Sequence, residues 1–255
     1  MRRVDAMELL RVGLDDSRLW KQAMDAISSF LPEGVFYFRE EGVRLNAIDP
    51  SQVVLVDFFA PRSTFTAYHL ADTSIRVPLD LSEYTKIISR VSADDRLLMV
   101  LEDVNLSLVF ERSDGALRRE FHVPLMDIPD RETDISPVEE AVRVKIPARI
   151  MKDALKDAGL FSSAAVLVAR DDFFMVEAKG QAGVTRSVAR KGSAVTIEGS
   201  PEAVSMYSLP FLQNIIRPAD PDSLIELSFG NDAPLKISYR IGDVSLTFYL
   251  AHMIL

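Results

Sequence analysis

The sequence predicts an α+β fold of two similar domains, each with two short helices packed on antiparallel sheets. Three observations lead to this prediction. Most of the chain alternates apolar and polar residues with a period of two, only four segments have a helical period, and the same order of elements recurs in both halves. Because the strands are many, short and bounded by turn residues, antiparallel pairing is favoured.

The composition is that of a globular protein with a sizeable core. Of the 255 residues, 48% are hydrophobic and 26% are charged, and cysteine is absent. Disulfides, thiolate metal sites and cysteine nucleophiles are therefore excluded, and a reducing compartment is compatible with the sequence. At roughly 100 to 200 residues per domain, the length favours two compact units. We expect no secretory signal, because Arg11 interrupts the first apolar stretch, and no membrane span, because runs such as residues 164–169 are too short.

The strands are expected wherever the alternation continues for several residues. Turn sequences such as Ser113-Asp114-Gly115 and Ile241-Gly242-Asp243 separate them. The segments expected to form strands are residues 7–12, 34–39, 43–48, 53–59, 64–70, 97–101, 106–111, 117–123, 141–146, 165–170, 173–178, 183–190, 194–198, 223–229, 235–241 and 244–250.

Four helices are expected, over residues 15–30, 80–91, 147–159 and 208–217. Acidic or hydroxyl caps begin the first two, proline stands in the first turn of the other two, and Gly159 ends the third. The apolar residues expected to face the sheets are Leu19, Ala23, Ala26, Ile27 and Phe30 in the first helix, Leu81, Tyr84, Ile87, Ile88 and Val91 in the second, Ile150, Ala154 and Leu155 in the third, and Phe211, Leu212, Ile215 and Ile216 in the fourth.

The two halves of the chain resemble each other. Residues 81–110 match residues 208–239, and residues 12–45 match residues 144–176. Between the halves lies a segment rich in proline and aspartate that has neither period, as is typical of an extended connector. The expected organisation is a first domain over residues 1–124, a connecting loop over 125–137 and a second domain over 138–255.

Three stretches carry a resemblance to a known family. Residues 42–56, GVRLNAIDPSQVVLV, contain a strand that ends in an acidic turn and restarts; Leu125-Met126-Asp127 begins the connector; and residues 234–241, PLKISYRI, with 248–254, FYLAHMI, form a C-terminal strand pair. In this order and spacing, together with the duplication, they make the chain similar over essentially its whole length to the sliding clamps of the proliferating cell nuclear antigen family.

The resemblance implies a DNA clamp fold that assembles into a trimeric ring around duplex DNA, with helices lining the hole and sheets outside. It implies a processivity factor without enzymatic activity or cofactor, placed on the template by a clamp loader. The implied clients are DNA polymerase, flap endonuclease and DNA ligase, and the implied ring partners are two further subunits, identical or different. No membrane partner is expected. The implied location is intracellular, on chromosomal DNA, in the cytoplasm of an archaeon or the nucleus of a eukaryote.

Basic residues lie off the apolar stripe of each expected helix, at spacings of three or four residues. In the family's architecture they would face DNA phosphates without reading bases. These residues are Arg18, Lys21, Lys86, Arg90, Arg149, Lys152, Lys156 and Arg217. The alternative is that they are ordinary solvated charges, because acidic residues share the same helices. The net charge of −9 excludes a protein that coats nucleic acid with its whole surface, but it does not exclude a local basic face.

The resemblance also implies two protein-binding surfaces. Ring closure would pair residues 117–123 of one subunit with residues 183–190 of the next, and solvated edges are the alternative. The contact residues would be Leu117, Arg119, Phe121, Val123, Val184, Arg186 and Val188. Client peptides would dock in an apolar pocket, although core packing is the alternative for part of it. Its residues would be Ile48, Val53, Met126, Ile135, Pro234, Leu250, Ala251 and His252.

Other functions remain as alternatives. For an enzyme, the sequence offers no P-loop, nucleotide-binding glycine motif, metal-ligand cluster or nucleophile elbow, and its three histidines lie far apart. A checkpoint-type clamp subunit would share the fold but usually carries insertions and extensions, which we do not expect here. One specialised subunit of a heterotrimeric replicative clamp also stays open, because Gln52, Thr133 and His252 depart from the residues common in the family.

Overall fold

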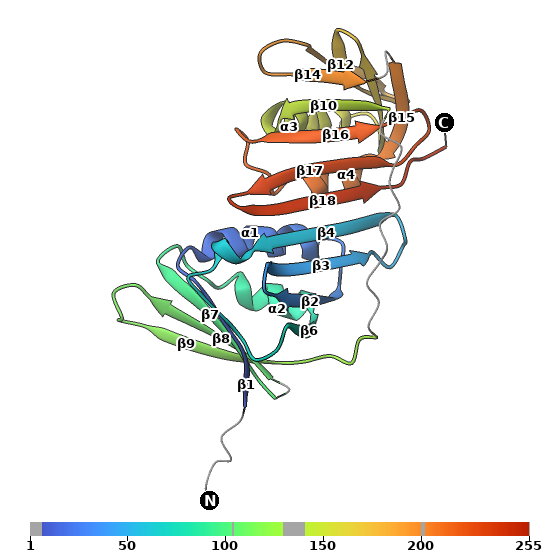
Figure 1. The fold of residues 1–255 in the computed structure, drawn as a ribbon. Coiled ribbons are helices and arrows are strands. Elements are labelled where there is room, and N and C mark those ends of the chain that lie inside the picture. Colours follow the sequence, from blue (N-terminus) through green and yellow to red (C-terminus); the bar gives the residue numbers. More distant parts are fainter. Residues whose placement is uncertain (1–6, 104, 130–140, 200–201, 255) are drawn as a thin grey trace, which may run out of the picture. The chain divides into compact units, whose positions relative to one another are not determined.

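The computed structural model describes residues 7–103, 105–129, 141–199 and 202–254, and it has the predicted α+β fold (Figure 1). The connector predicted over residues 125–137 is described as far as residue 129, where it has no regular secondary structure. Its remaining residues, including Thr133 and Ile135, lie outside the described part of the chain.

Four α-helices, one 3-10 helix and eighteen strands occupy the described residues. The helices are α1 (Ser17–Ser28), η1 (Arg62–Thr64), α2 (Leu81–Ile88), α3 (Ala148–Ala158) and α4 (Leu209–Ile216). The strands of the first half are β1 (Glu8–Leu14), β2 (Glu33–Arg39), β3 (Gly42–Ile48), β4 (Val54–Pro61), β5 (Ala67–Leu70), β6 (Ser74–Asp80), β7 (Asp95–Glu102), β8 (Asn105–Arg112) and β9 (Arg118–Pro124). Those of the second half are β10 (Val142–Pro147), β11 (Ala164–Arg170), β12 (Phe173–Gly180), β13 (Gly183–Arg190), β14 (Thr196–Gly199), β15 (Glu202–Ser208), β16 (Leu224–Phe229), β17 (Leu235–Ile241) and β18 (Val244–Leu250).

The chain divides into two compact units that do not follow the sequence halves strictly. Unit 1 holds the described parts of Met1–Ala47, Asp57–Thr133 and Ile241–Ser245, and unit 2 holds those of Ile48–Val56, Asp134–Arg240 and Leu246–Leu255. Residues 48–56 and the C-terminal residues therefore belong to the same unit, although about two hundred positions separate them in the sequence.

Unit 1 contains an antiparallel five-stranded sheet in the order β5-β1-β7-β8-β9, and β2 pairs with both β3 and β6. In unit 2, β13-β12-β11-β15 form an antiparallel four-stranded sheet, while β10 pairs with β14 and β16, and β16 with β17. Strands β9 and β13 are thus sheet edges. Both units confirm the antiparallel pairing expected from the alternation.

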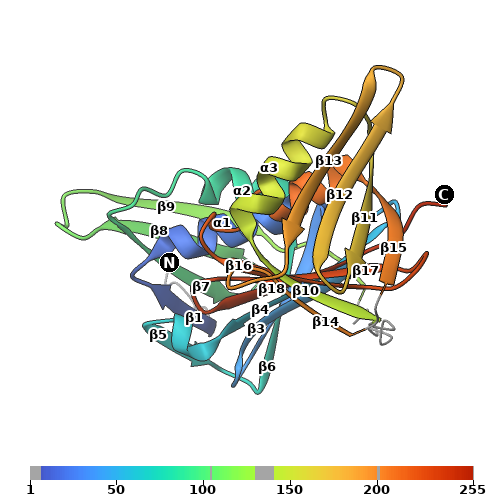
Figure 2. The same ribbon diagram turned by 90° about the horizontal axis from the view of Figure 1, so that it is seen from above.

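Each unit has one pair of neighbouring helices, α1 with α2 and α3 with α4. Asp16 and Asp80 cap α1 and α2 by accepting hydrogen bonds from the amides of Arg18 and Glu83. Proline stands in the first turn of α4, where its missing N–H costs no helical hydrogen bond. Figure 2 shows α3 beside β12 and β13, which it also contacts.

An aromatic cluster fills the core of unit 1. The Trp20 ring lies 6.0 Å from Phe36, 5.7 Å from Phe58 and 5.8 Å from Phe65, measured between ring centroids. Its Nε1 donates to the hydroxyl of Tyr84 on α2 at 2.7 Å, so the buried indole N–H has a partner and α1 is tied to α2. In unit 2 the buried Tyr239 hydroxyl donates to the carbonyl of Ile215 at 2.8 Å and ties β17 to α4.

The buried faces of the helices differ from the predicted stripes. Four residues that were expected to face the sheets are only half-buried, namely Leu19, Ile87, Ile150 and Phe211. Trp20, Met24, Met151 and Leu209 are buried instead. Because each helix packs against a neighbouring helix as well as against strands, its buried arc is rotated toward that neighbour.

Two strands were not predicted. Strand β6 contains Pro78, and a proline in a sequence pattern argues against a strand. It is tolerated here because β6 is an edge strand that pairs with β2. In strand β15 the buried position 205 is occupied by the small polar residue Ser205. Because an apolar residue is expected at a buried position, the sequence of this strand does not alternate clearly. The strand expected over residues 64–70 is shorter, because η1 occupies its beginning and β5 starts at Ala67.

Candidate nucleic-acid interface and docking surfaces

Most of the basic residues predicted to face DNA are exposed on the helices or just beyond them. Arg18 pairs with Asp16 at 2.9 Å, Lys86 pairs with Glu83 at 2.6 Å, and Arg149 pairs with Asp222. The exposed set comprises Arg18, Lys86, Arg90, Arg149, Lys156 and Arg217. The hydrogen bond to Glu83 raises the pKa of Lys86, which therefore keeps its charge over the whole physiological range. Exposed ion pairs of this kind are weak, so these cations can exchange a carboxylate for a phosphate.

Lys21 and Lys152 differ from this set because both are half-buried and donate to backbone carbonyls. The Lys21 ammonium lies 2.8 Å from the carbonyl oxygen of Ser89, just after α2. The Lys152 ammonium lies 3.0 Å from that of Arg217, just after α4. Burial lowers the pKa of Lys152. Lys21 and Lys152 therefore differ from the other six basic residues in burial and in their hydrogen-bond partners, a difference that the sequence pattern did not reveal.

The candidate ring-closing strands are both sheet edges, and their side chains fall into two groups. Leu117, Val184, Arg186 and Val188 are exposed, with fractions of 46%, 45% and 52% for the three apolar residues in that order. Arg186 pairs with Glu177 of the adjacent β12. Exposed valines on an edge strand leave apolar surface available beside unpaired backbone groups.

The other three residues of the predicted contact turn toward their own unit. Val123 is buried, and the half-buried Phe121 lies 5.2 Å from the Phe110 ring between centroids. Arg119 bonds the buried carboxylate of Asp95 and donates to the carbonyl of Arg90 at 3.1 Å. These side chains stabilise β9 within its sheet, which leaves the backbone of β9 and the exposed side chains of Arg118, Glu120 and His122 for contact with another chain.

The candidate client surface lies in unit 2, where two distant segments meet. The amide of Ala251 donates to the carbonyl of Val53 at 2.9 Å, and the amide of Met253 donates to the carbonyl of Met206 at 2.7 Å. Ile48 is 45% exposed, Ala251 is exposed, and Leu250 is fully buried beneath them. Val53 and His252 are half-buried and Pro234 is exposed, whereas Met126 belongs to unit 1.

Two apolar residues of this surface were not predicted. Met253 is 40% exposed and Ile254 is 90% exposed, directly after Ala251 and His252. Their sequence offered a signal, because these apolar residues follow β18 outside its alternating pattern, and Met253 joins β15 through an isolated bridge to Met206.

Asp49 fixes the turn between the two parts of the 48–56 segment. Its carboxylate is 6% exposed and accepts from the amides of Ser51 at 3.0 Å, Val53 at 2.7 Å and Val54 at 2.6 Å. Burial alone raises the pKa of Asp49, but the hydrogen bonds from Ser51, Val54 and Val53 together outweigh it and hold the pKa below its ordinary value. The Asp49 carboxylate therefore caps this turn.

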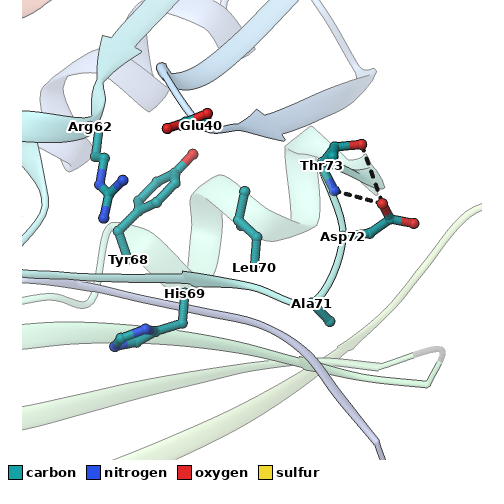
Figure 3. Close-up of a pocket in the computed structure, with 8 residues that line it drawn as sticks. All are labelled: Glu40, Arg62, Tyr68, His69, Leu70, Ala71, Asp72 and Thr73. Atoms are coloured by element: carbon teal, nitrogen blue, oxygen red, sulfur yellow. Dashed lines mark hydrogen bonds between the residues drawn. The ribbon is translucent and has the colours of Figure 1, made fainter.

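A cavity of about 590 Å³ lies elsewhere in unit 1, and none of the predicted site residues lines it (Figure 3). It is bounded by Glu40, Arg62, Tyr68, His69, Leu70, Ala71, Asp72 and Thr73. The hydroxyl of Tyr68 donates to the carbonyl of Arg39 at 2.7 Å, and burial raises the pKa of Tyr68 to about 12. The Arg62 guanidinium lies 5.7 Å from the centre of the Tyr68 ring. Two polar groups that line the cavity, the Tyr68 hydroxyl and the Arg62 guanidinium, therefore already have local partners.

Among the described residues, His, Asp and Glu form no group of three or more that could hold a metal ion. In the same part of the chain, no helix is long and apolar enough to cross a membrane. His122 hydrogen-bonds Ser107 across the β8–β9 pair at 2.9 Å, as expected for a strand residue with a local partner.

Two units with paired helices on antiparallel sheets, with basic residues along the exposed helix faces, define the class of DNA clamps. The model of the proliferating cell nuclear antigen N-terminal domain matches residues 9–134. The crystal structure of PCNA from Thermococcus kodakaraensis superposes with a TM-score of 0.90 at 25% identity, covering 96% of this chain and 100% of that one. The chain belongs to the proliferating cell nuclear antigen family.

Similar proteins span nearly the same length. "DNA polymerase sliding clamp 1" of Thermococcus kodakarensis is 29% identical over 244 residues, which are 94% of this chain and 96% of that protein. The "DNA polymerase sliding clamp" proteins of Pyrococcus furiosus and Thermofilum pendens are each 29% identical over 247 residues, covering 94% and 95% of this chain and 96% and 98% of theirs. The family predicted from the sequence is thereby confirmed.

Proposed function

We propose that this protein is a DNA sliding clamp, a processivity factor that encircles duplex DNA in a ring of three chains and tethers DNA polymerase to its template. The similarity to sliding clamps over 94% of the chain supports this function. The clamp works by topology and does not itself catalyse a reaction. Flap endonuclease and DNA ligase are proposed as further clients, and a clamp loader as the partner that opens the ring on chromosomal DNA.

The observation that carries the proposal is the exposed basic row on the helix pair of each unit. Arg18 and Lys86 lie on the helices of unit 1, and Arg149 and Lys156 lie on α3 of unit 2. Long cations with weak local partners suit phosphate contacts that form and break as a ring moves along DNA. Such contacts read no bases, and a sliding ring requires none to be read.

Ring closure is proposed to pair β9 of one chain with β13 of the next. Among the strands of the described residues, β9 and β13 each have a neighbour on one side only. Pairing would satisfy the open backbone groups and cover Val184 and Val188. The inward packing of Phe121 and Val123 fits this role, because it leaves the β9 backbone as the contact surface.

Client peptides are proposed to dock on the unit 2 surface around Ile48 and Ala251. The exposed apolar side chains of Ile48, Met253 and Ile254 give it a hydrophobic character. The hydrogen bond between Ala251 and Val53 holds its two segments together before any peptide arrives, which reduces the ordering cost of binding.

The decisive experiment compares retention on circular and linear DNA. The protein is loaded with its host's clamp loader and ATP onto nicked circular duplex DNA, washed at high salt, and the DNA is then linearised. A topologically linked ring stays on the circle and is lost after cutting, whereas a protein held by contacts alone dissociates equally from both forms. Equal dissociation would reject the clamp function.

The composition of the ring is a separate question, which native mass measurement answers. The protein alone is expected to have the mass of three chains of 28.5 kDa. A single-chain mass that becomes a ring only with sister chains would instead assign it to a mixed ring, either replicative or of the checkpoint type.

A further inference from the structure

The two half-buried lysines make the same contact in different units. Lys21 is the fifth residue of α1, and Lys152 is the fifth residue of α3. The Lys21 ammonium lies 2.8 Å from the carbonyl oxygen of Ser89 and 3.4 Å from that of Val91. The Lys152 ammonium lies 3.0 Å from the carbonyl oxygen of Arg217 and 2.5 Å from that of Ala219.

The accepting carbonyls also correspond. Ser89 is the first residue after α2 and Arg217 is the first residue after α4, and both helices have eight residues. Val91 and Ala219 are each the third residue after their helix. The donor and both acceptors thus recur at equivalent places in the duplicated structure, which makes a chance contact of two long side chains an inadequate explanation.

Elementary helix physics explains why a lysine suits this place. The last carbonyls of a helix have no partner within it and carry partial negative charge. An ammonium group has three donors, so one lysine can satisfy the carbonyl of the C-cap residue, Ser89 or Arg217, together with a second carbonyl two residues further along the turn. The second hydrogen bond of each lysine, to Val91 or Ala219, is part-buried, which limits the competition from water.

The turns held in this way carry two of the basic residues of the proposed DNA-binding row. Arg90 lies between Ser89 and Val91, and its own carbonyl accepts from Arg119 at 3.1 Å. Arg217 itself offers the carbonyl that Lys152 binds. The side chains of Arg90 and Arg217 are exposed, and the backbone of each turn sets the direction of the Cα–Cβ bond from which its arginine extends.

We infer that Lys21 and Lys152 are positioning residues, which fix the turns after α2 and α4 and thereby aim Arg90 and Arg217 at the DNA. The part of the inference that concerns DNA rests on the proposed function, whereas the part that concerns the turns does not. Lys86 and Lys156 serve as matched controls, because each is an exposed lysine on the same helix pair.

Hydrogen exchange of the free protein tests the turns. The amides of Ser89, Arg90 and Val91 donate to Thr85, Ile87 and Ile88, and those of Arg217 and Ala219 donate to Gln213 and Ile216. In Lys21→Met and Lys152→Met the amides of the corresponding turn should exchange about 3- to 30-fold faster, the range expected for losing a cation at a partly buried helix C-terminus. Lys156→Met should leave these amides unchanged, and Lys86→Met, which removes an exposed cation from the last turn of α2, should accelerate them less than Lys21→Met does. Equal exchange in Lys21→Met and wild type, and in Lys152→Met and wild type, would overturn the inference.

A double-mutant cycle tests the route to DNA. Retention on circular DNA is measured across a salt series for Lys21→Met, Arg90→Met and the double variant. If Lys21 acts through Arg90, the double variant should lose no more than Arg90→Met alone, whereas Lys86→Met should add its own loss to that of Arg90→Met. Additive losses for Lys21 and Arg90 would mean that Lys21 binds phosphate itself. If even the wild type is not retained, the clamp function fails, while the exchange experiment still decides the role of the two lysines.

Discussion

Asp49 controls the local shape of the proposed client surface through a single carboxylate. Three backbone donors of the turn, from Ser51, Val53 and Val54, point at its two oxygens. The turn includes Gln52, which has a positive φ of 58° and therefore depends on its surroundings to stay in that conformation. The carboxylate compensates for this backbone strain from within the turn.

Asp49→Asn should reduce the free energy of unfolding by about 1–3 kcal/mol at neutral pH, because an amide cannot accept these hydrogen bonds as well as a carboxylate does. The pKa of Asp49 is lower in the folded state than its ordinary value, so its stabilisation is complete above the unfolded pKa and disappears as the pH falls through the folded one. The difference between the two proteins should therefore be constant above about pH 5 and shrink below about pH 4.

Urea unfolding followed by circular dichroism over this pH range measures the effect. Asp72→Asn is the control, because Asp72 is an exposed aspartate that accepts from Thr73 in a surface turn. If Asp49→Asn and Asp72→Asn had equal effects, the Asp49 carboxylate would not hold the turn.

At the level of single side chains, the sequence did not predict the hydrogen-bond partners of two of the candidate site residues, Lys21 and Arg119. It placed Lys21 among solvent-facing cations, because helical spacing shows only on which side of its own helix a residue lies. Whether a second helix ends there depends on tertiary packing. Arg119 was expected at a subunit contact because of the family resemblance. Its partner Asp95 lies on β7, and the pattern of residues along one strand does not show which side chain of another strand it will bind.

At the level of secondary structure, the exposed edge of β13 is the feature with the clearest consequence. Its residues alternate between half-buried and exposed along the whole strand, so the described residues of unit 2 leave one face and one edge of the strand uncovered. Long exposed edges promote pairing with another chain, and a protein that uses such an edge must keep its backbone donors intact.

Val188→Pro should convert the ring into monomers or open oligomers, because proline removes a backbone donor and fixes φ. Val188→Thr keeps the backbone and the branched side chain and should leave the ring intact. Native mass measurement at micromolar concentration distinguishes the two, with circular dichroism to show that both variants are folded. An intact ring in folded Val188→Pro would place the subunit contact elsewhere.

The client surface provides the second prediction at this level. Ala251→Asp should weaken binding of a client peptide with a turn and two aromatic residues on the order of tenfold or more, because it places a charge where apolar anchors would be desolvated. His252→Pro should change the order of affinities among several such peptides without abolishing binding. Calorimetry measures both, and unchanged affinity in Ala251→Asp would remove the client site from this surface.

Most of the secondary structure could be predicted from the sequence, since sixteen alternating segments and four helices follow from periodicity alone. The missed strands β6 and β15 show the limit of this method. Pro78 and Ser205 break the pattern locally, whereas the strands exist because β2 and β11 pair with them along their length. Pairing with distant strands is not visible in a local window.

For the whole molecule, charge must be distributed unevenly if the proposed function is right. Three chains of net charge −9 would give a ring of −27, which repels DNA from its outer surface. Attraction to DNA would then come from the exposed basic residues on the helices and just after them. A ring with this distribution of charge would hold DNA weakly at the centre and avoid adhesion elsewhere.

Replacing Arg18, Lys86, Arg149 and Lys156 together by alanine should weaken DNA contact and reduce its salt dependence, because fewer counterions are released per ring. Stability should change little, since the four side chains are exposed. Polymerase stimulation and DNA retention across a salt series measure the effect. Identical salt slopes for the variant and the wild type would show that these residues do not face DNA.

The aromatic cluster of unit 1 has an optical consequence for the study of this molecule. Trp20 is the only tryptophan in the chain, and its ring is buried among Phe36, Phe58 and Phe65. Selectively excited tryptophan fluorescence therefore reports the melting of unit 1 alone, while the amide absorption of both units contributes to circular dichroism. Coincident denaturation curves from the two signals would mean that the units unfold as one cooperative body, and separated curves would give each unit its own midpoint.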